Sequence, residues 1–194
     1  MTKSIAAFIW IAGLVGWYII RHPFQRRARD HAVKISLLDK REWALLCAAT
    51  MGLFVIPGVY SVTGIPASWD RPFSPTLAWL ALGPLLSALW LFRRSHRDLG
   101  RNWSVTLKLR DQHELVKHGV YRVIRHPMYL SFFLLGIAQF LLIPNWLAGA
   151  AGLVGAGLLF GFRAFREEQM MIDIFGEQYR LYMTETKRII PWVI

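Results

Sequence analysis

Residues 129–162, YLSFFLLGIAQFLLIPNWLAGAAGLVGAGLLFGF, contain two apolar runs that are separated only by Pro144-Asn145. A connection this short joins two helices that run antiparallel, so the stretch predicts a helical hairpin. A helix needs about 20 apolar residues to cross a bilayer. The first arm, 129–143, is shorter than that, so we expect the pair that it forms with the second arm, 146–162, to be tilted or shallow in the membrane.

The second arm is rich in glycine, with GAAGLVGAGLLFG at 149–161. A glycine-rich loop that binds a nucleotide follows a strand and opens a helix, and no strand pattern precedes this one. Small residues in a membrane helix let a neighbouring backbone approach closely. The pattern therefore predicts close helix packing rather than a nucleotide site.

Three further apolar segments precede the hairpin, at 4–20, 43–65 and 76–92. The chain is therefore predicted to be an all-α, polytopic integral membrane protein with about five transmembrane helices. Proline lacks a backbone donor and clashes with the preceding helical turn, so we expect Pro84 to kink the third segment.

The first segment has a cleaved signal peptide as its alternative reading. It has no basic region beyond Lys3 and no clear small-residue cleavage site before Arg21, so a retained span is the better interpretation.

The composition fits a membrane protein, because only 18% of the residues are charged, against about a quarter in soluble domains. The net charge of +11 follows the predicted topology: 21 of the 23 Lys and Arg residues lie in the alternate segments 21–42, 93–128 and 163–194. By the positive-inside rule, the N-terminus is outside and the C-terminus is cytoplasmic. Nucleic acid is not needed to explain the basicity. The single cysteine, Cys47, excludes an internal disulfide.

Polar residues crowd the segment that leads into the hairpin, HELVKHGVYRVIRHPMY at 113–129. Pro127 suits the first turn of a helix, where its missing donor costs nothing. We therefore expect His126 at the cap of this helix and Tyr129 just inside it, where they could line a pocket facing both water and lipid. Arg122 and Arg125 could equally be interfacial anchors.

A second polar stretch follows the hairpin, FRAFREEQMMIDIFGEQYRLYMTETKRIIPW at 162–192. Arg163 and Glu167 are four residues apart and so share one helical face, whereas Arg166 and Glu168 are expected to turn away from it. An ordinary ion pair would explain the first two. Ionisable groups where an apolar run ends also favour a functional site. The helix is expected to continue over 163–188, with an interruption near Gly176.

In combination, an RHPxY motif, an R-x-x-x-E-E some forty residues later and an FGxxY closely resemble the isoprenylcysteine carboxyl methyltransferases and their phospholipid-methyltransferase relatives. The resemblance covers roughly residues 99–192, and the chain looks like a short prokaryotic member of the family. It implies an integral membrane enzyme that uses S-adenosyl-L-methionine and releases S-adenosyl-L-homocysteine. It also implies a cytoplasmic C-terminal cofactor-binding subdomain without a Rossmann fold. The expected organisation is three N-terminal spans in 1–92 and a catalytic half in 93–194.

The resemblance also implies roles for individual residues. The residues expected to bind the cofactor are His113, Glu114, Leu115, Val116, Tyr121, His126, Pro127, Met128, Tyr129 and Glu167. Glu114 stands where the family often has a small hydroxyl residue, so its backbone is the more trustworthy contact. Arg163 is expected to bind the substrate, and Arg163 and Glu167 together form the expected catalytic pair. No metal is implied.

The expected reaction is O-methylation of the C-terminal carboxylate of a prenylated cysteine in a protein or peptide, with the lipophilic substrate entering from the bilayer. Methylation of a phospholipid or another lipophilic small molecule is one alternative. An amine acceptor would need a base, either Glu167 or His126. The other alternative is a non-catalytic lipid-binding or scaffold protein whose polar groups only anchor the span ends.

Overall fold

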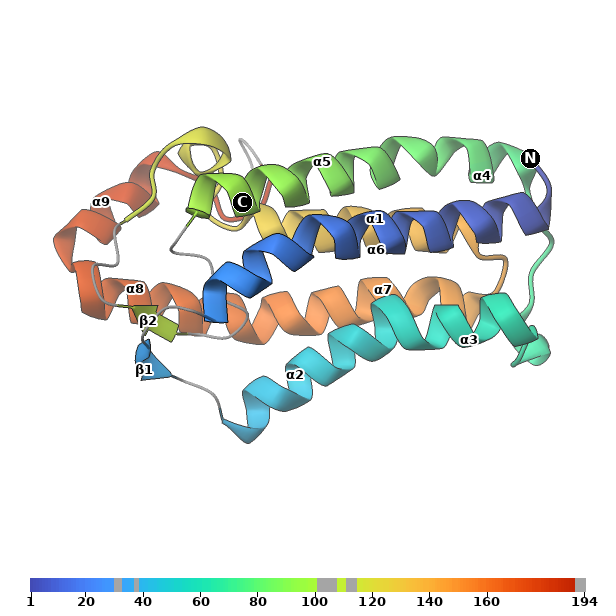
Figure 1. Cartoon of the computed structure of the whole chain (residues 1–194), viewed down its shortest axis with the longest axis horizontal. Helices are drawn as coiled ribbons and strands as arrows, with labels where there is room; N and C mark the ends of the chain where they lie inside the picture. The colour runs from blue at the N-terminus through green and yellow to red at the C-terminus, as the bar shows by residue number, and fades with distance from the viewer. Residues whose placement is uncertain (30–32, 37–38, 101–107, 111–114, 191–194) are drawn as a thin grey trace.

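The computed structural model of the chain describes residues 1–29, 33–36, 39–100, 108–110 and 115–190. The described part is nearly all helical. Figure 1 shows the long helices running side by side, with α8 and α9 at one end and the N-terminus at the other. The helical elements are α1 (Lys3–Arg29), α2 (Lys40–Thr50), the π-helix η1 (Met51–Val55), α3 (Ile56–Thr63), the 3₁₀ turn η2 (Ala67–Trp69), α4 (Pro75–Leu80), α5 (Leu82–Leu99), the 3₁₀ turn η4 (Gly119–Arg122), α6 (Pro127–Leu142), α7 (Trp146–Leu159), the π-helix η5 (Phe160–Ala164), α8 (Phe165–Phe175) and α9 (Glu177–Glu185).

The predicted spans correspond to five of these helical stretches. Four are long and apolar enough to cross a membrane by length and composition: Lys3–Arg26, Lys40–Thr63, Pro75–Leu99 and Trp146–Phe175. The fifth, α6, is apolar but shorter, as the sequence predicted. The short strands β1 (Val33–Ser36) and β2 (Lys108–Arg110) add one antiparallel pair to this helical protein.

The hairpin is confirmed, since α6 ends at Leu142 and α7 begins at Trp146. Asn145 caps α7: its side-chain Oδ1 accepts a hydrogen bond from the backbone N–H of Ala148 at 2.9 Å. The amide nitrogen of Asn145 donates to Asp70 Oδ1 at 2.9 Å, which ties the connection before α4 to the hairpin turn. Where a kink was predicted at Pro84, the helix has a one-residue interruption at Ala81 between α4 and α5, because Pro84 cannot donate to the carbonyl of Leu80.

A buried glutamine joins three of the helices. In η1 the N–H of Ile56 bonds to the carbonyl of Met51, five residues back. The next bond in that register would come from Pro57, which has no N–H, so the carbonyl of Gly52 loses its helical donor. The side-chain amide of Gln139 on α6 supplies one instead, at 3.0 Å, and also donates to the carbonyl of Ala148 on α7 at 2.7 Å.

The glycines of α7 pack as the sequence predicted. A Cβ on Gly155 would lie 3.0 Å from the carbonyl oxygen of Ala48, and one on Gly152 would press on the Gln139 side chain. From the other side, a Cβ on Gly52 would overlap the carbonyl oxygen of Ala151. The helix formed by α2, η1 and α3 therefore meets α7 backbone to backbone.

This close approach predicts that Gly52→Ala destabilises the protein. The new methyl group would meet backbone atoms that cannot rotate away, and overpacking of this kind costs about 1–3 kcal/mol. The measurement is thermal unfolding of the purified protein in detergent. Gly58→Ala is the matched control, because nothing lies within 4 Å of a Cβ at that position. Equal melting temperatures for the two variants would contradict this packing.

Candidate functional site

The segment before α6 is shaped by a glycine. Gly119 has φ +61°, a left-handed conformation that glycine adopts without strain. A Cβ there would also overlap the carboxylate of Asp98, which accepts a hydrogen bond from the backbone N–H of Val120 at 2.9 Å. Asp98 is itself held by Arg94 at 3.2 Å. The end of α5 thus fixes the start of η4, and with it the buried Tyr121.

Tyr182 of α9 secures the other side of η4. Its hydroxyl donates to the backbone carbonyl of Tyr121 at 2.6 Å. Burial raises the pKa of Tyr182 to about 12, so this hydroxyl remains a donor throughout the physiological range. The predicted helical tail is therefore part of the site's framework. As predicted, it is interrupted at Gly176, which separates α8 from α9.

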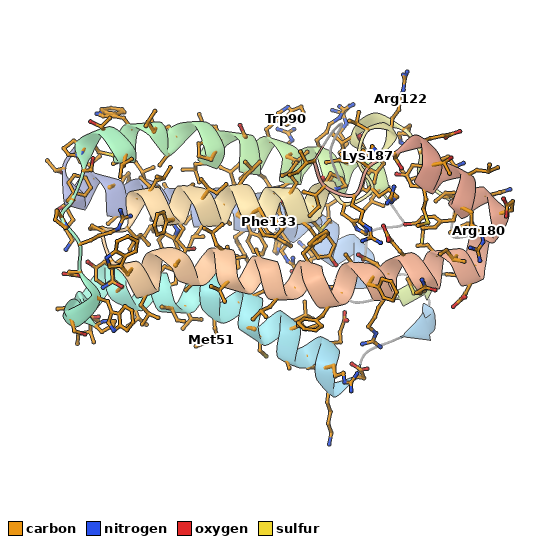
Figure 2. All side chains as sticks on the ribbon, turned by 180° about the vertical axis from the view of Figure 1, so that it is seen from behind. Met51, Trp90, Arg122, Phe133, Arg180 and Lys187 are labelled. Atoms are coloured by element: carbon orange, nitrogen blue, oxygen red, sulfur yellow. The ribbon has the colours of Figure 1, made fainter. Side chains whose placement is uncertain are left out.

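The chain after α9 pairs with the segment that precedes α6. The N–H of Arg125 donates to the carbonyl of Lys187 at 2.7 Å, and that of His126 donates to the carbonyl of Arg188 at 2.9 Å. Figure 2 places Arg122, Lys187 and Arg180 at the same end of the molecule. His126 is the N-cap residue of α6 and Pro127 its first residue, as the sequence predicted.

Glu168 is the centre of the polar cluster at this end. Its carboxylate accepts from Arg125 Nε at 3.0 Å and from Arg188 Nη2 at 2.7 Å, and it lies 3.1 Å from His126 Nε2. Only 2% of the residue is exposed. The prediction that Glu168 turns away from the site is wrong.

The π-helix η5 explains this error. A π-turn repeats at five residues rather than four, so it rotates the residues that follow relative to a regular helix. Glu168, five residues after Arg163, is turned inward together with Glu167. Arg166 does point elsewhere, to Asp39 at 3.1 Å.

Glu167 meets the two residues of the HPxY motif. The hydroxyl of Tyr129 donates to Glu167 Oε2 at 2.9 Å, and His126 Nδ1 lies 3.7 Å from the same oxygen. The rings of His126 and Phe160 pack edge-on against that of Tyr129. Glu167 is 30% exposed at the side chain, whereas Tyr129 and His126 are buried. The two polar stretches of the sequence thus converge on one carboxylate that solvent still reaches.

Arg163 forms an ion pair that sequence reasoning missed. Its Nε lies 3.4 Å from Glu42 Oε1 in the first turn of α2, and Glu167 is also close enough to act on its charge. Glu42 is fully buried, although its neighbours Lys40 and Arg41 give the segment the look of a charged surface. The available signal was Asp39-x-x-Glu42, a helix-start pattern, and Asp39 does cap α2.

The remaining predicted residues divide into three groups. Pro127 and Tyr121 are buried near the site, and Leu115, Val116 and Met128 are half-buried in or beside the segment that leads to it. His113 and Glu114 lie outside the described residues. Among the residues that the structure describes, no group of three or more His, Cys, Asp or Glu side chains could hold a metal ion.

Comparison with known proteins links this arrangement to one family. The model of the isoprenylcysteine carboxyl methyltransferase (ICMT) family matches residues 80–173. Protein-S-isoprenylcysteine O-methyltransferase B of Arabidopsis thaliana is 30% identical over 164 residues, which cover 81% of this chain and 78% of the relative. The protein-S-isoprenylcysteine O-methyltransferase of Tribolium castaneum is 33% identical over 92 residues, which cover 47% of this chain and 33% of the relative.

The fold also has a solved counterpart. The structure of a eukaryotic intramembrane Ras methyltransferase, an isoprenylcysteine carboxyl methyltransferase, superposes with a TM-score of 0.55 at 24% sequence identity. The match covers 81% of this chain and 55% of that one. The chain spans about half the length of several of the relatives that it matches. For one relative from Oryza sativa subsp. indica, the match covers 50% of that protein's length.

Proposed function

Because the chain belongs to the isoprenylcysteine carboxyl methyltransferase family, we propose that it methylates the C-terminal carboxylate of a prenylated cysteine. The observation that supports this most directly is the meeting of Tyr129, His126 and Glu167 at one end of the helix that carries Arg163. A partly exposed carboxylate backed by buried rings, next to a buried arginine, suits one cationic and one anionic ligand.

The cofactor would be S-adenosyl-L-methionine, which supplies an electrophilic methyl group on a sulfonium sulfur. The residues fit such a ligand. Glu167 is held in place by the Tyr129 hydroxyl and is open on its other side, so it can accept from an amino group. Tyr121, His126 and Tyr129 would shape the wall of the pocket, with Leu115, Val116 and Met128 completing it.

Catalysis would consist mainly of positioning. A carboxylate acceptor has a reference pKa of about 4, so it is already ionised at neutral pH and needs no general base. Holding two reactants in line can supply about 7–11 kcal/mol of the barrier. Arg163 would pair with the acceptor carboxylate and aim one of its oxygens at the methyl group. Its planar donor fork suits this task better than a lysine would.

We infer the orientation in the membrane from charge. Segments 21–42, 93–128 and 163–194 hold nearly all the Lys and Arg residues, which favours a cytoplasmic site and C-terminus and an N-terminus outside. The water-soluble cofactor would enter from the cytoplasm, while the lipid tail of the acceptor would approach from the bilayer between helices.

A labelled-donor assay with purified protein tests the proposal. We expect methyl transfer to N-acetyl-S-farnesylcysteine, and none to the methyl ester of the same compound, whose carboxylate is blocked. Transfer to phosphatidylethanolamine instead would move the protein to the amine-methylating alternative. Saturable binding of S-adenosyl-L-homocysteine, measured by calorimetry, is also expected. Its absence together with no transfer would favour a non-catalytic role.

A further inference from the structure

A fully buried carboxylate lies in the N-terminal half of the chain, directly before the second predicted span. Glu42 is 0% exposed, in the first turn of α2, and its backbone N–H is bonded to the cap residue Asp39 at 2.8 Å. Burying a charged group is costly unless it is paired. Its partner is Arg163, which is 7% exposed and belongs to the opposite half of the sequence.

Two ion pairs join the start of α2 to η5 and α8, the helical segments that continue α7. The two acidic residues are three positions apart in the sequence, and so are the two arginines. Asp39 pairs with Arg166 at 3.1 Å, and Glu42 pairs with Arg163 at 3.4 Å. The pairs differ in their surroundings: the Asp39 and Arg166 side chains are 47% and 33% exposed, whereas Glu42 and Arg163 are almost completely sealed. An exposed pair contributes about 0–1 kcal/mol, so docking of the helix depends little on it. The sealed pair differs in kind, because its positive member is a buried guanidinium that lies beside Glu167.

Glu42 contacts the Arg163 guanidinium at Nε, the nitrogen that joins it to the rest of the side chain. Arginine presents its donors in a rigid planar fork, so the charge of Glu42, 3.4 Å from Nε, favours one orientation of the two terminal nitrogens. Glu167 acts on the same guanidinium from its own helix. Two carboxylates from different helices therefore confine Arg163 beside Tyr129 and Glu167.

We propose that Glu42 is a positioning residue, which aims the Arg163 guanidinium at the carboxylate of the acceptor. The proposal rests on the proposed function and adds α2 to the acceptor site. Without the Glu42 charge, the guanidinium would be less well oriented and the acceptor carboxylate would bind in more than one pose. Cofactor binding, which depends on Glu167 and the segment before α6, would be affected far less.

The test compares Glu42→Gln, which keeps the shape and removes the charge, with Arg166→Gln, which breaks the exposed pair between the same two elements. We expect Glu42→Gln to lower kcat/KM for N-acetyl-S-farnesylcysteine by roughly 10- to 100-fold, the scale of a small misplacement of a reactant. The Kd of S-adenosyl-L-homocysteine should change less than about threefold. A tenfold change in Kd corresponds to about 1.4 kcal/mol, so the expected change in binding free energy is well below that value. Arg166→Gln should leave both constants near wild type.

A mutant cycle gives the second criterion. In an Arg163→Ala background, Glu42→Gln should have no further effect on kcat/KM, because the residue it positions is gone. Additive losses, a wild-type kcat/KM in Glu42→Gln, or equal losses in Glu42→Gln and Arg166→Gln would each overturn the proposal.

Two further controls separate the ways it could fail. If Glu42→Gln does not fold, Glu42→Asp takes its place, because it keeps the charge but moves the carboxylate back by one methylene. Glu42→Asp must then show the same loss of kcat/KM while it still binds S-adenosyl-L-homocysteine. A wild-type protein that methylates no carboxylate would overturn the proposed function itself. A wild-type protein that does so, with Glu42 variants of equal rate, would overturn only the role of Glu42.

Discussion

Arg163→Ala is expected to lower kcat/KM for a prenylcysteine carboxylate by about 10²–10³-fold, the usual cost of removing a preorganised charge-stabilising group. The variant removes the only side chain proposed to hold the acceptor carboxylate. Glu167, Tyr129 and His126 keep their mutual contacts, so S-adenosyl-L-homocysteine should still bind. Initial rates with a labelled donor give the first quantity, and calorimetry gives the second.

Arg166→Ala is the control for this experiment, because it deletes an arginine from the same helix whose ion pair is to the partly exposed Asp39. Arg163→Lys is informative as well: it keeps the charge but replaces the fork by a single ammonium, so it should recover only part of the rate. A rate for Arg163→Ala equal to that of Arg166→Ala would remove Arg163 from the acceptor site.

Glu168→Ala is expected to lower the free energy of unfolding by about 3–5 kcal/mol, the usual cost of removing one partner from a buried charge cluster. The carboxylate is shared by Arg125, His126 and Arg188, and Arg125 is itself almost completely buried. Without Glu168, the guanidinium groups of Arg125 and Arg188 would lie together with no shared anion. The effect is measured by thermal unfolding in detergent.

Asp173→Ala provides the comparison, because Asp173 is exposed on the same helix. It should unfold close to wild type, since surface substitutions usually change stability by less than about 0.5 kcal/mol. If the two variants unfolded at the same temperature, Glu168 could not be the centre of the cluster.

The parts of the fold that were predicted correctly depend on local patterns. The hairpin follows from two apolar runs around Pro144-Asn145, and the cap at His126 follows from a proline in the first turn of α6. The residues at which a helix begins and ends are set largely by neighbouring residues, so a single sequence can reveal them.

The parts that were missed depend on geometry between segments. Glu168 was misplaced because nothing in FGFRA announces a π-turn, and one extra residue per turn changes which side chains face inward. Glu42 was missed because its partner lies more than a hundred residues further along the chain. The convergence of Tyr129 and Glu167 came from the resemblance to a family, since spacing alone could not bring two separate helices together.

The backbone pairing of Lys187 and Arg188 with the residues before α6 has a consequence for how the protein is made. Chains generally fold from the N-terminus during synthesis, and these two residues are translated after all the apolar helices in the described part of the chain. The amide groups of Arg125 and His126 therefore wait for their acceptors until the rest of the bundle has been inserted. A nascent chain halted after α9 but before residue 187 would hold its helices in the bilayer while Arg125 and His126 at the start of α6 still lacked these two backbone partners.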